Sequence, residues 1–387
     1  MKHRNGRETE VSGGAGGIYV HLPYCASRCG YCAFVVTTDG SSRGVYMQAL
    51  EREASLLAPE AAGTFFDAVY LGGGTPSLLP AEAVARLLDV LRSRFAVDEG
   101  AEVTLEANPE DVTEEVVHAW IDAGVNRVSV GVQSLEDAEL TAVGRRHDAG
   151  RARAALQTVT GAGLSVSGDL ILGLPGQTKE GFRRSLSGLC DAGVRHVSVY
   201  LLESEKTKTI EEDRRRHPER YLSDDAQADL WLEMGETLAA RGFLHYEISN
   251  WAKPGRQARH NVKYWKRAQT LGLGVSAHEL WSGRRRANAS NLESYLSQLQ
   301  AGHRPIALDH PVTGEQASRE EIFLGLRLAE GVPAAGIEAF VTAGEDVRLW
   351  NDYEGWLSEG VLERRDDRVA FSERGFLVSN EVLSRFV

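Results

Sequence analysis

The sequence predicts an α/β fold in which repeated βα units form a partial (βα)6-type barrel around a parallel sheet. Between residues 17 and 200, six short apolar segments alternate with amphipathic segments of helix length, the pattern of βα units. Several apolar segments are followed directly by glycine, polar or acidic residues, at the strand ends where parallel α/β proteins carry their functional groups. The 387 residues are enough to bury a large core without disulfides. A closed barrel of eight units is the alternative.

Apolar runs and helical periodicity define the elements of the first half. The six expected strands are Ile18–Leu22, Ala68–Leu71, Val103–Glu106, Arg127–Val130, Val166–Leu172 and His196–Tyr200. The helices expected between them are Val45–Leu57, Ala81–Phe95, Glu114–Ala123, Ala149–Ala162 and Glu180–Ala192. Strands and helices therefore alternate without interruption as far as Tyr200.

The pattern changes after Tyr200. A charged stretch from Glu211 to Arg220 is interpreted as a solvated loop or helix face. A helix near Asp224–Ala240, a strand-like Tyr246–Ile248 and ordered loops over Asn250–Ala289 are expected to follow it. From Ala307 onward we expect helices over Ser318–Leu328, Pro333–Phe340 and Asp346–Glu359, and then a β-hairpin over Val361–Phe371 that turns at Asp366-Asp367.

Helices followed by a hairpin are typical of a small winged-helix-like domain, which a chain of this length has room for. We therefore predict four parts. They are a flexible N-terminal tail over residues 1–16, a barrel over 17–250, a connecting region over 251–306 and a C-terminal winged-helix-like domain over 307–387.

Composition and charge restrict the class of protein. The chain has 55 acidic and 43 basic residues and a formal net charge of −12, which argues against generic nucleic-acid binding through basic patches. No run of about 18 apolar residues predicts a membrane span. The polar start from Met1 to Gly17 does not resemble a secretory signal. We expect a cytoplasmic protein in a reducing compartment, where clustered cysteines serve as ligands.

Three of the four cysteines, Cys25, Cys29 and Cys32, lie within eight residues directly after the first expected strand. Thiolates are soft ligands that select zinc, copper(I) or iron–sulfur clusters. A structural zinc site usually needs four ligands, and no further pair lies nearby. The spacing favours a [4Fe–4S] cluster with one iron open to a small molecule; a zinc site and three unrelated thiols are the alternatives. Cys190, in an expected helix, is interpreted as a small buried hydrophobe.

Four other strand ends carry groups suited to a ligand. Gly72-Gly73-Gly74-Thr75-Pro76 ends the second strand, and glycines let backbone N–H groups approach a ligand closely. Glu106, Gln133 and Asp169 follow at later strand ends. Such side chains can bind hydroxyl groups and cations, and each charge-assisted hydrogen bond contributes about 1.5–3 kcal/mol to the binding free energy. The alternative for each is a helix N-cap.

The CxxxCxxC pattern, with Tyr31 before its last cysteine, resembles the radical S-adenosylmethionine superfamily. The resemblance implies that the open iron binds S-adenosylmethionine and that the reduced cluster cleaves it, while the protein supplies orientation and excludes water. The segments Ile18–Cys25, Ala123–Arg127 and Gly144–His147 narrow the resemblance to the oxygen-independent coproporphyrinogen III oxidases and their relatives. By this resemblance the residues of the S-adenosylmethionine site are Tyr19, Tyr31, Gly73, Gly74, Thr75, Glu106, Gln133, Arg145 and Asp169.

Two branches of that family differ in function. The oxidases decarboxylate two propionates of coproporphyrinogen III oxidatively, whereas the HemW-type haem chaperones bind haem and pass it to acceptor proteins. The oxidases carry a further cysteine two residues after the third cluster cysteine and a longer N-terminal arm. Here that position is Phe34, and 24 residues precede Cys25. Both features favour the chaperone branch.

The segment His260–Trp265 reads HNVKYW and is similar to the HNxxYW motif of the chaperone branch. Imidazole is a common axial ligand of haem iron, and aromatic faces suit a porphyrin. The nearby cations that could pair with haem propionates are Arg256, Arg259, Lys263, Lys266 and Arg267. The alternative is a packed, hydrogen-bonded His260 within a basic loop.

Four positions depart from the family pattern. Ala33 replaces an aspartate, Thr207 and Ser276 each replace a glycine, and Ala258 replaces a cysteine that commonly precedes the HNxxYW motif. Ser276 has a Cβ, so a positive φ there would cost more than at glycine. These departures concern the substrate or haem pocket and leave the cluster motif intact.

We therefore expect a haem chaperone that carries a [4Fe–4S] cluster and S-adenosylmethionine. Its expected partners are haem and haem-accepting proteins of unknown identity, without nucleic acid, and any membrane contact would come through the acceptors. The alternatives are a coproporphyrinogen III oxidase and a radical enzyme acting on an unrelated substrate.

Overall fold

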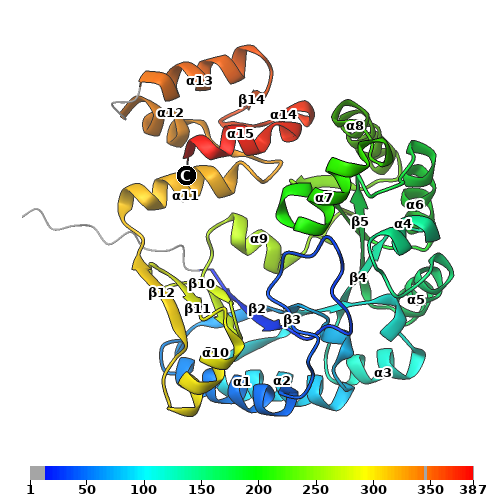
Figure 1. Ribbon diagram of the computed structural model, residues 1–387. Coiled ribbons are helices and arrows are strands. Elements are labelled where there is room, and N and C mark those ends of the chain that lie inside the picture. The colour runs from blue at the N-terminus through cyan, green and yellow to red at the C-terminus, as the bar shows by residue number, and fades with distance from the viewer. Residues whose placement is uncertain (1–13, 344–346, 387) are drawn as a thin grey trace, which may run out of the picture.

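The computed structural model describes residues 14–343 and 347–386, and its main feature is a curved sheet of twelve strands (Figure 1). Six strands lie side by side and run parallel in chain order. They are β1 (Gly16–Leu22), β2 (Phe65–Gly73), β3 (Ala96–Ala107), β4 (Arg127–Gln133), β5 (Ser165–Leu172) and β6 (His196–Leu201). The six strands expected from the sequence are confirmed, and each is longer than expected by one or more residues.

Helices connect these strands and cover the outer face of the sheet (Figure 1). They are α1 (Arg43–Leu57), α2 (Ala81–Arg94), α3 (Glu114–Asp122), α4 (Asp137–Ala142), α5 (Ala149–Gly161) and α6 (Lys179–Asp191). The side chains of Thr113, Asp148 and Thr178 cap α3, α5 and α6 by accepting hydrogen bonds from backbone N–H groups of the first turn, which fixes where each helix begins. The apolar faces of these helices share one core with the strands.

The charged stretch after β6 forms α7 (Lys208–Arg216), with a single buried residue, Ile210; it is thus a solvated helix face. The expected helix follows as α8 (Asp224–Ala240), and β7 (Leu244–Glu247) pairs antiparallel with β8 (Asn250–Ala252). Short 3-10 turns are η1 (Pro76–Leu78), η2 (Pro109–Asp111), η3 (Ser204–Lys206), η4 (Pro218–Arg220) and η5 (Ser384–Phe386).

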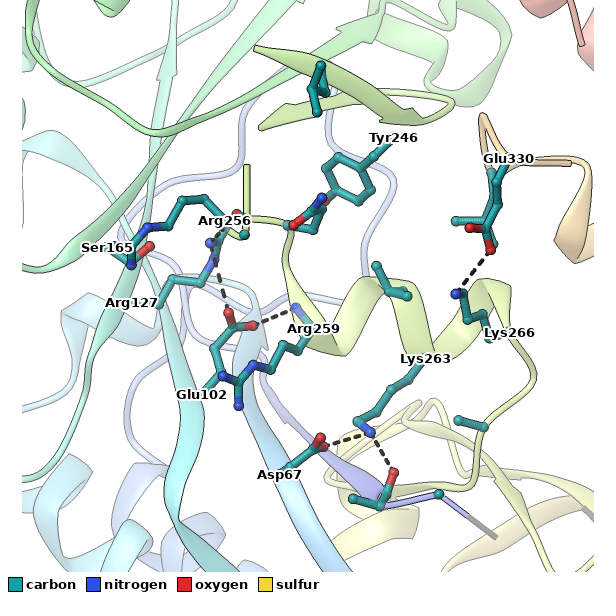
Figure 2. A pocket seen from close by; sticks show the side chains of 18 of the residues that line it. Asp67, Glu102, Arg127, Ser165, Tyr246, Arg256, Arg259, Lys263, Lys266 and Glu330 are labelled. Carbon is teal, nitrogen blue, oxygen red and sulfur yellow. Dashed lines mark hydrogen bonds and ion pairs between the residues drawn. The ribbon is translucent and has the colours of Figure 1, made fainter. Parts of the chain in front are cut away.

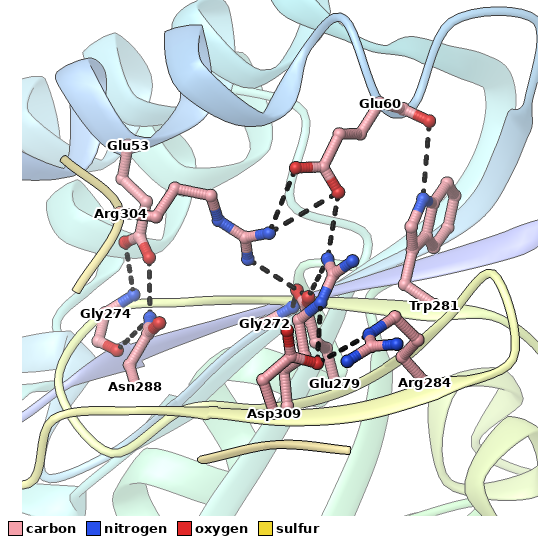
Figure 3. A network of polar contacts seen from close by, with 11 residues as sticks. Glu53, Glu60, Gly272, Gly274, Glu279, Trp281, Arg284, Asn288, Arg304 and Asp309 are labelled. Atoms are coloured by element: carbon pink, nitrogen blue, oxygen red, sulfur yellow. Dashed lines mark hydrogen bonds and ion pairs between the residues drawn. The ribbon is translucent and has the colours of Figure 1, made fainter. Parts of the chain in front are cut away.

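The expectation of loops over Asn250–Ala289 is wrong. This segment contains β8, α9 (Arg259–Trp265), β9 (Thr270–Leu273), β10 (His278–Trp281) and β11 (Arg284–Asn288). These strands are three to five residues long. Their apolar segments are too short to stand out, and β10 and β11 also carry charged side chains. Arg286 of β11 bonds to Glu279 of β10 and to Glu60 after α1. Arg304, which precedes β12, bonds to the same two carboxylates (Figure 3).

The sheet is open. β9 pairs with the free side of β1, and the order ends at β12 (Ile306–Pro311) on one side and at β7 on the other. Within the described ranges these end strands have no pairing with each other, so the partial barrel is confirmed and the closed eight-unit barrel is wrong. The helix α10 (Leu292–Gln300) lies between β11 and β12 along the chain. The predicted boundaries at 250 and 306 remain predictions, and strands from both sides of residue 250 share this sheet.

The C-terminal part has a second apolar core, which includes Ile337, Tyr353 and Phe371. Its helices are α11 (Gly314–Gly325), α12 (Ala334–Ala343), α13 (Val347–Ser358), α14 (Glu373–Leu377) and α15 (Ser379–Leu383). A three-stranded sheet, ordered β13-β15-β14, joins β13 (Val332–Pro333), β14 (Leu362–Arg365) and β15 (Arg368–Phe371). The expected helices and hairpin are confirmed, with Asp366 in the turn at φ 54°.

Two expectations fall partly outside the described residues. They are the flexible tail, of which residues 1–13 are not described, and the helix start at Asp346. In the part of the chain that is described, no helix combines the length and apolarity needed to cross a membrane.

Candidate functional site

A cavity of about 410 Å³ opens at the carboxyl ends of β2 to β6. All three clustered cysteines line it from the loop after β1. The structure also places eight other predicted site residues around it: Tyr31, Gly73, Gly74, Thr75, Glu106, Gln133, Arg145 and Asp169. Eleven of the thirteen predicted residues therefore meet in one place, because parallel strands bring their ends to one edge of the sheet.

Backbone hydrogen bonds hold the cysteine loop in place. The Cys25 N–H donates to the Thr37 carbonyl at 2.9 Å, and the Cys32 N–H to the Cys29 carbonyl at 3.1 Å. The Thr75 hydroxyl donates to Cys25 Sγ at 3.4 Å. All three thiols are partly buried, and burial raises the pKa of the Cys25 and Cys32 thiols. These thiols would ionise on binding iron, since thiolates are the ligands of iron–sulfur clusters.

The glycine run brings β2 against the start of the cysteine loop. Gly73 has φ 108°, and a Cβ there would lie 2.5 Å from the His21 ring. A Cβ on Gly74 would lie 2.7 Å from the Leu22 carbonyl oxygen, to which the Gly74 N–H donates at 2.8 Å. The glycines thus allow a close approach between two segments of the chain, and a side chain at either position would push these segments apart. The expected approach of their N–H groups to a ligand stays a prediction.

Glu106 is a partly buried carboxylate that is held from both sides. The Tyr70 hydroxyl donates to one oxygen at 2.7 Å and the Gly73 N–H to the other at 3.0 Å. Burial nevertheless raises the pKa of Glu106 to about 7, because removal from water disfavours the charged form. Asp169 is similar: it accepts from the Ser129 hydroxyl at 3.0 Å, and burial raises its pKa.

Arg145 carries a positive charge to the cysteine loop. Its guanidinium donates to Asn108 Oδ1 and to the Gly131 carbonyl, both at 2.7 Å, and approaches Cys29 Sγ at 3.7 Å. Gln133 has φ 65° at the end of β4. That left-handed conformation costs an L-residue about 1–2 kcal/mol, and such strain is concentrated at functional sites.

Tyr19 and His260 lie behind the cavity rather than on its lining. The His260 ring packs against Tyr19 and Tyr70, with ring centroids 6.1 and 5.4 Å apart, and its Nε2 is 2.9 Å from the Tyr264 hydroxyl. His260 is 1% exposed, and burial lowers its pKa to about 3. His260 is therefore a neutral, enclosed imidazole, and its role as a haem ligand stays a prediction.

Sequence reasoning assigned no role to Tyr70, Asn108 or Ser129, which position Glu106, Arg145 and Asp169. A signal for two of them was present. Tyr70 lies two residues before the glycine run, and side chains two apart on a strand share a face; Asn108 follows Glu106 at the same interval. Ser129, a small residue within β4, gives no comparable signal.

Comparison with known proteins agrees with this site. The model of the radical SAM superfamily matches residues 19–188, a range that holds the cysteine loop and the carboxyl ends of β2 to β5. That superfamily implies a [4Fe–4S] cluster and S-adenosylmethionine.

The fold and the full-length similarity point to one family. The solved coproporphyrinogen III oxidase of Escherichia coli superposes with a TM-score of 0.83 over 96% of this chain and 90% of its own, at 24% identity, which shows the shared fold. The heme chaperone HemW of Mycobacterium tuberculosis is 36% identical over 95% of this chain and 93% of its own. The Escherichia coli protein of that name is 32% identical over 96% and 97%. The chain therefore belongs to the radical SAM superfamily and, within it, to the HemW family.

Proposed function

We propose that this protein is a haem chaperone, which binds haem and transfers it to acceptor proteins. The observation that carries the proposal is similarity at 30–36% identity to proteins named heme chaperone HemW, over 95% of the chain. This similarity is not limited to the cofactor barrel, because such coverage includes α9 and most of the C-terminal part.

The residues of the cluster cavity fit the cofactors of the superfamily. Cys25, Cys29 and Cys32 supply three soft donors on one ordered loop, and Arg145 beside them offsets the negative charge of a thiolate-ligated cluster. The cluster with S-adenosylmethionine supplies reductive cleavage of a sulfonium when both are bound. The protein's part is to bind and orient these groups and to exclude water.

Three side chains around the cavity suit the remaining groups of S-adenosylmethionine. Glu106, fixed by Tyr70 and Gly73, would accept hydrogen bonds from its amino group. Asp169 and Gln133, at neighbouring strand ends, would bind ribose hydroxyls and the sulfonium end. These assignments rest on matching the hydrogen-bond donors and acceptors of the side chains to those of S-adenosylmethionine.

Position 34 supports the chaperone over the oxidase. Phe34 stands where the oxidase pattern has a further cysteine, lines the cluster cavity and is 66% exposed. It offers an apolar surface and no thiol. An anaerobic assay with coproporphyrinogen III and a reductant tests the alternative. If carbon dioxide and protoporphyrinogen form, the protein is an oxidase.

Haem titration of a variant pair tests the proposal. In His260→Ala the ring between Tyr19 and Tyr70 is lost, and we expect weaker haem binding and a changed Soret band. His118→Ala, on the exposed side of α3, is the matched control and should bind haem as the wild type does. Iron content and thermal midpoint show whether each variant is folded. Equal Soret spectra and affinities for both variants would remove His260 from the haem site.

A further inference from the structure

A second cavity, of about 950 Å³, opens at the opposite end of the barrel strands. Glu102 near the middle of β3, Arg127 at the start of β4 and Ser165 at the start of β5 line it (Figure 2). The cluster cavity instead meets the last residues of the same strands, such as Glu106 and Gln133. The two cavities are therefore separated by the length of the strands.

The helix α9 lies between them, inside the curve of the sheet (Figure 1). Its residues His260 and Tyr264 face the ring layer that leads through Tyr70 to Glu106. Arg259, Val262, Lys263 and Lys266 line the second cavity, and their spacing of three or four places them on one helix face. The HNxxYW helix thus presents its histidine to the cluster side and its cations to the second cavity.

The lining of this cavity has an excess of positive charge. Its cations are Arg127, Arg256, Arg259, Lys263 and Lys266, and its carboxylates are Asp67, Glu102 and Glu330. Lys263 is paired with Asp67 at 2.6 Å and Lys266 with Glu330 at 3.0 Å. Two more cations than anions remain, which suits a ligand with two negative charges.

Arg127 and Arg256 lack the close ion pairs that hold Lys263 and Lys266. Arg127 is 2% exposed, yet its five N–H donors make one hydrogen bond, to the Arg256 carbonyl at 3.2 Å, and its nearest carboxylate, on Glu102, is 4.0 Å away. Arg256 is exposed, and its guanidinium has neither ion pair nor hydrogen bond to the described residues. A buried guanidinium with donors to spare is a strong site for a carboxylate.

The rest of the lining is apolar enough for a large organic ligand. Leu244, Tyr246, Val262 and Leu328 contribute to the wall, and the volume lies in the range of roughly 300–1,000 Å³ typical of small-molecule sites. Haem has this chemistry: a flat apolar ring with two carboxylates at one edge.

We infer that the second cavity takes the propionate edge of haem, with Arg127 and Arg256 binding the two carboxylates. This inference rests on the proposed function and adds the location of the haem carboxylates. The haem carboxylates and S-adenosylmethionine then lie at opposite ends of the barrel.

The test compares haem with its dimethyl ester, which keeps the ring and removes both charges. The cluster-loaded full chain is titrated with each, as wild type, Arg256→Ala and the control Arg86→Ala, whose cation is exposed on α2. We expect Arg256→Ala to weaken haem binding about tenfold, the effect of one charge-assisted bond, and to leave ester binding unchanged. Arg127→Gln should show the same selectivity if it folds, and saturating S-adenosylmethionine should not displace haem.

The outcomes separate the inference from the proposed function. Haem binding that is saturable in the wild type and unchanged in Arg256→Ala would overturn the inference and leave the chaperone proposal standing. Displacement of haem by S-adenosylmethionine would place haem in the cluster cavity and overturn it too. Absence of saturable haem binding in the wild type would overturn both.

Discussion

Ser276 departs from the family pattern, and this departure places a strained backbone conformation in the fold. The sequence has serine where the related loop has glycine, and the structure gives Ser276 a φ of 58°. A Cβ in the left-handed region costs about 1–2 kcal/mol relative to an unstrained backbone. The loop keeps this conformation because both ends are held: the Ser276 N–H donates to the Ala289 carbonyl, and the Gly274 N–H donates to Glu53.

Ser276→Gly should therefore raise the free energy of unfolding by up to about 1 kcal/mol, since glycine removes the strain but adds chain entropy to the unfolded state. Chemical denaturation measures the change. Ser297→Gly, within α10, serves as a control of opposite sign and should lower the stability by about 0.5–1 kcal/mol. A loss of stability in Ser276→Gly would mean that the serine stabilises the loop in another way.

Glu53 is a buried carboxylate whose charge costs stability. It accepts hydrogen bonds from Tyr295 at 2.6 Å, and from the Gly274 N–H at 2.8 Å and Asn288 at 2.5 Å (Figure 3). Burial still raises its pKa from 4.5 to about 7. The folded protein therefore holds this proton more tightly than the unfolded chain does, and the stability that the protonated form contributes is complete below about pH 4.5 and is lost as the pH rises to about 7.

The variant Glu53→Gln lacks this titration. We expect the stability of the wild type relative to the variant to fall between about pH 4.5 and pH 7, by an amount on the order of 3 kcal/mol. Glu82→Gln, at an exposed position of α2, should show a difference that stays flat with pH. A flat difference for Glu53→Gln as well would show that the carboxyl is not protonated in the folded protein.

At the scale of elements, the turn after β2 determines how the cluster loop meets the sheet. Gly73 combines a positive φ with contact to His21, and His21 Nε2 is 2.9 Å from the Val35 carbonyl at the far end of the cysteine loop. His21 therefore links the turn after β2 to the segment that closes the cysteine loop.

Gly73→Ala should destabilise the protein by roughly 2–4 kcal/mol, because backbone strain adds to a clash with His21, and should also weaken S-adenosylmethionine binding. Gly63→Ala separates these effects, since Gly63 also has a positive φ, 84°, but an open surrounding. That control should lose about 1 kcal/mol of stability and keep its affinity for S-adenosylmethionine. Equilibrium binding of S-adenosylmethionine to the cluster-loaded protein measures this affinity. Equal affinities in the two variants would contradict a role for the turn in the site.

The limits of sequence reasoning also lie at the scale of elements. Strands β1 to β6 are buried on both faces and therefore consist of apolar runs that can be recognised directly. β11, with the sequence RRRAN, cannot be recognised this way. Its arginines find carboxylate partners on β10, β12, α11 and the turn after α1 only once the chain has folded. The same reason hides the location of His260: its motif is visible in the sequence, but its burial against Tyr19 and Tyr70 depends on β9 pairing with β1.

At the scale of the whole molecule, one open sheet separates two cavities of different character. The cavity at the carboxyl ends of the strands gathers thiols, carboxylates and Arg145, and the cavity at the other end gathers surplus cations around α9. Eleven of the thirteen predicted site residues could be brought together from sequence, because strand ends of a parallel sheet share one edge. The second cavity could not, because its lining comes from strand starts, α9 and the C-terminal part.

The most direct test of the account is an anaerobic titration of the cluster-loaded protein with haem, followed by the Soret band. We predict saturation at one haem per chain, with iron and sulfide contents showing that the cluster is intact throughout. Haem binding that does not saturate, in protein with an intact cluster, would contradict the assignment as a haem chaperone.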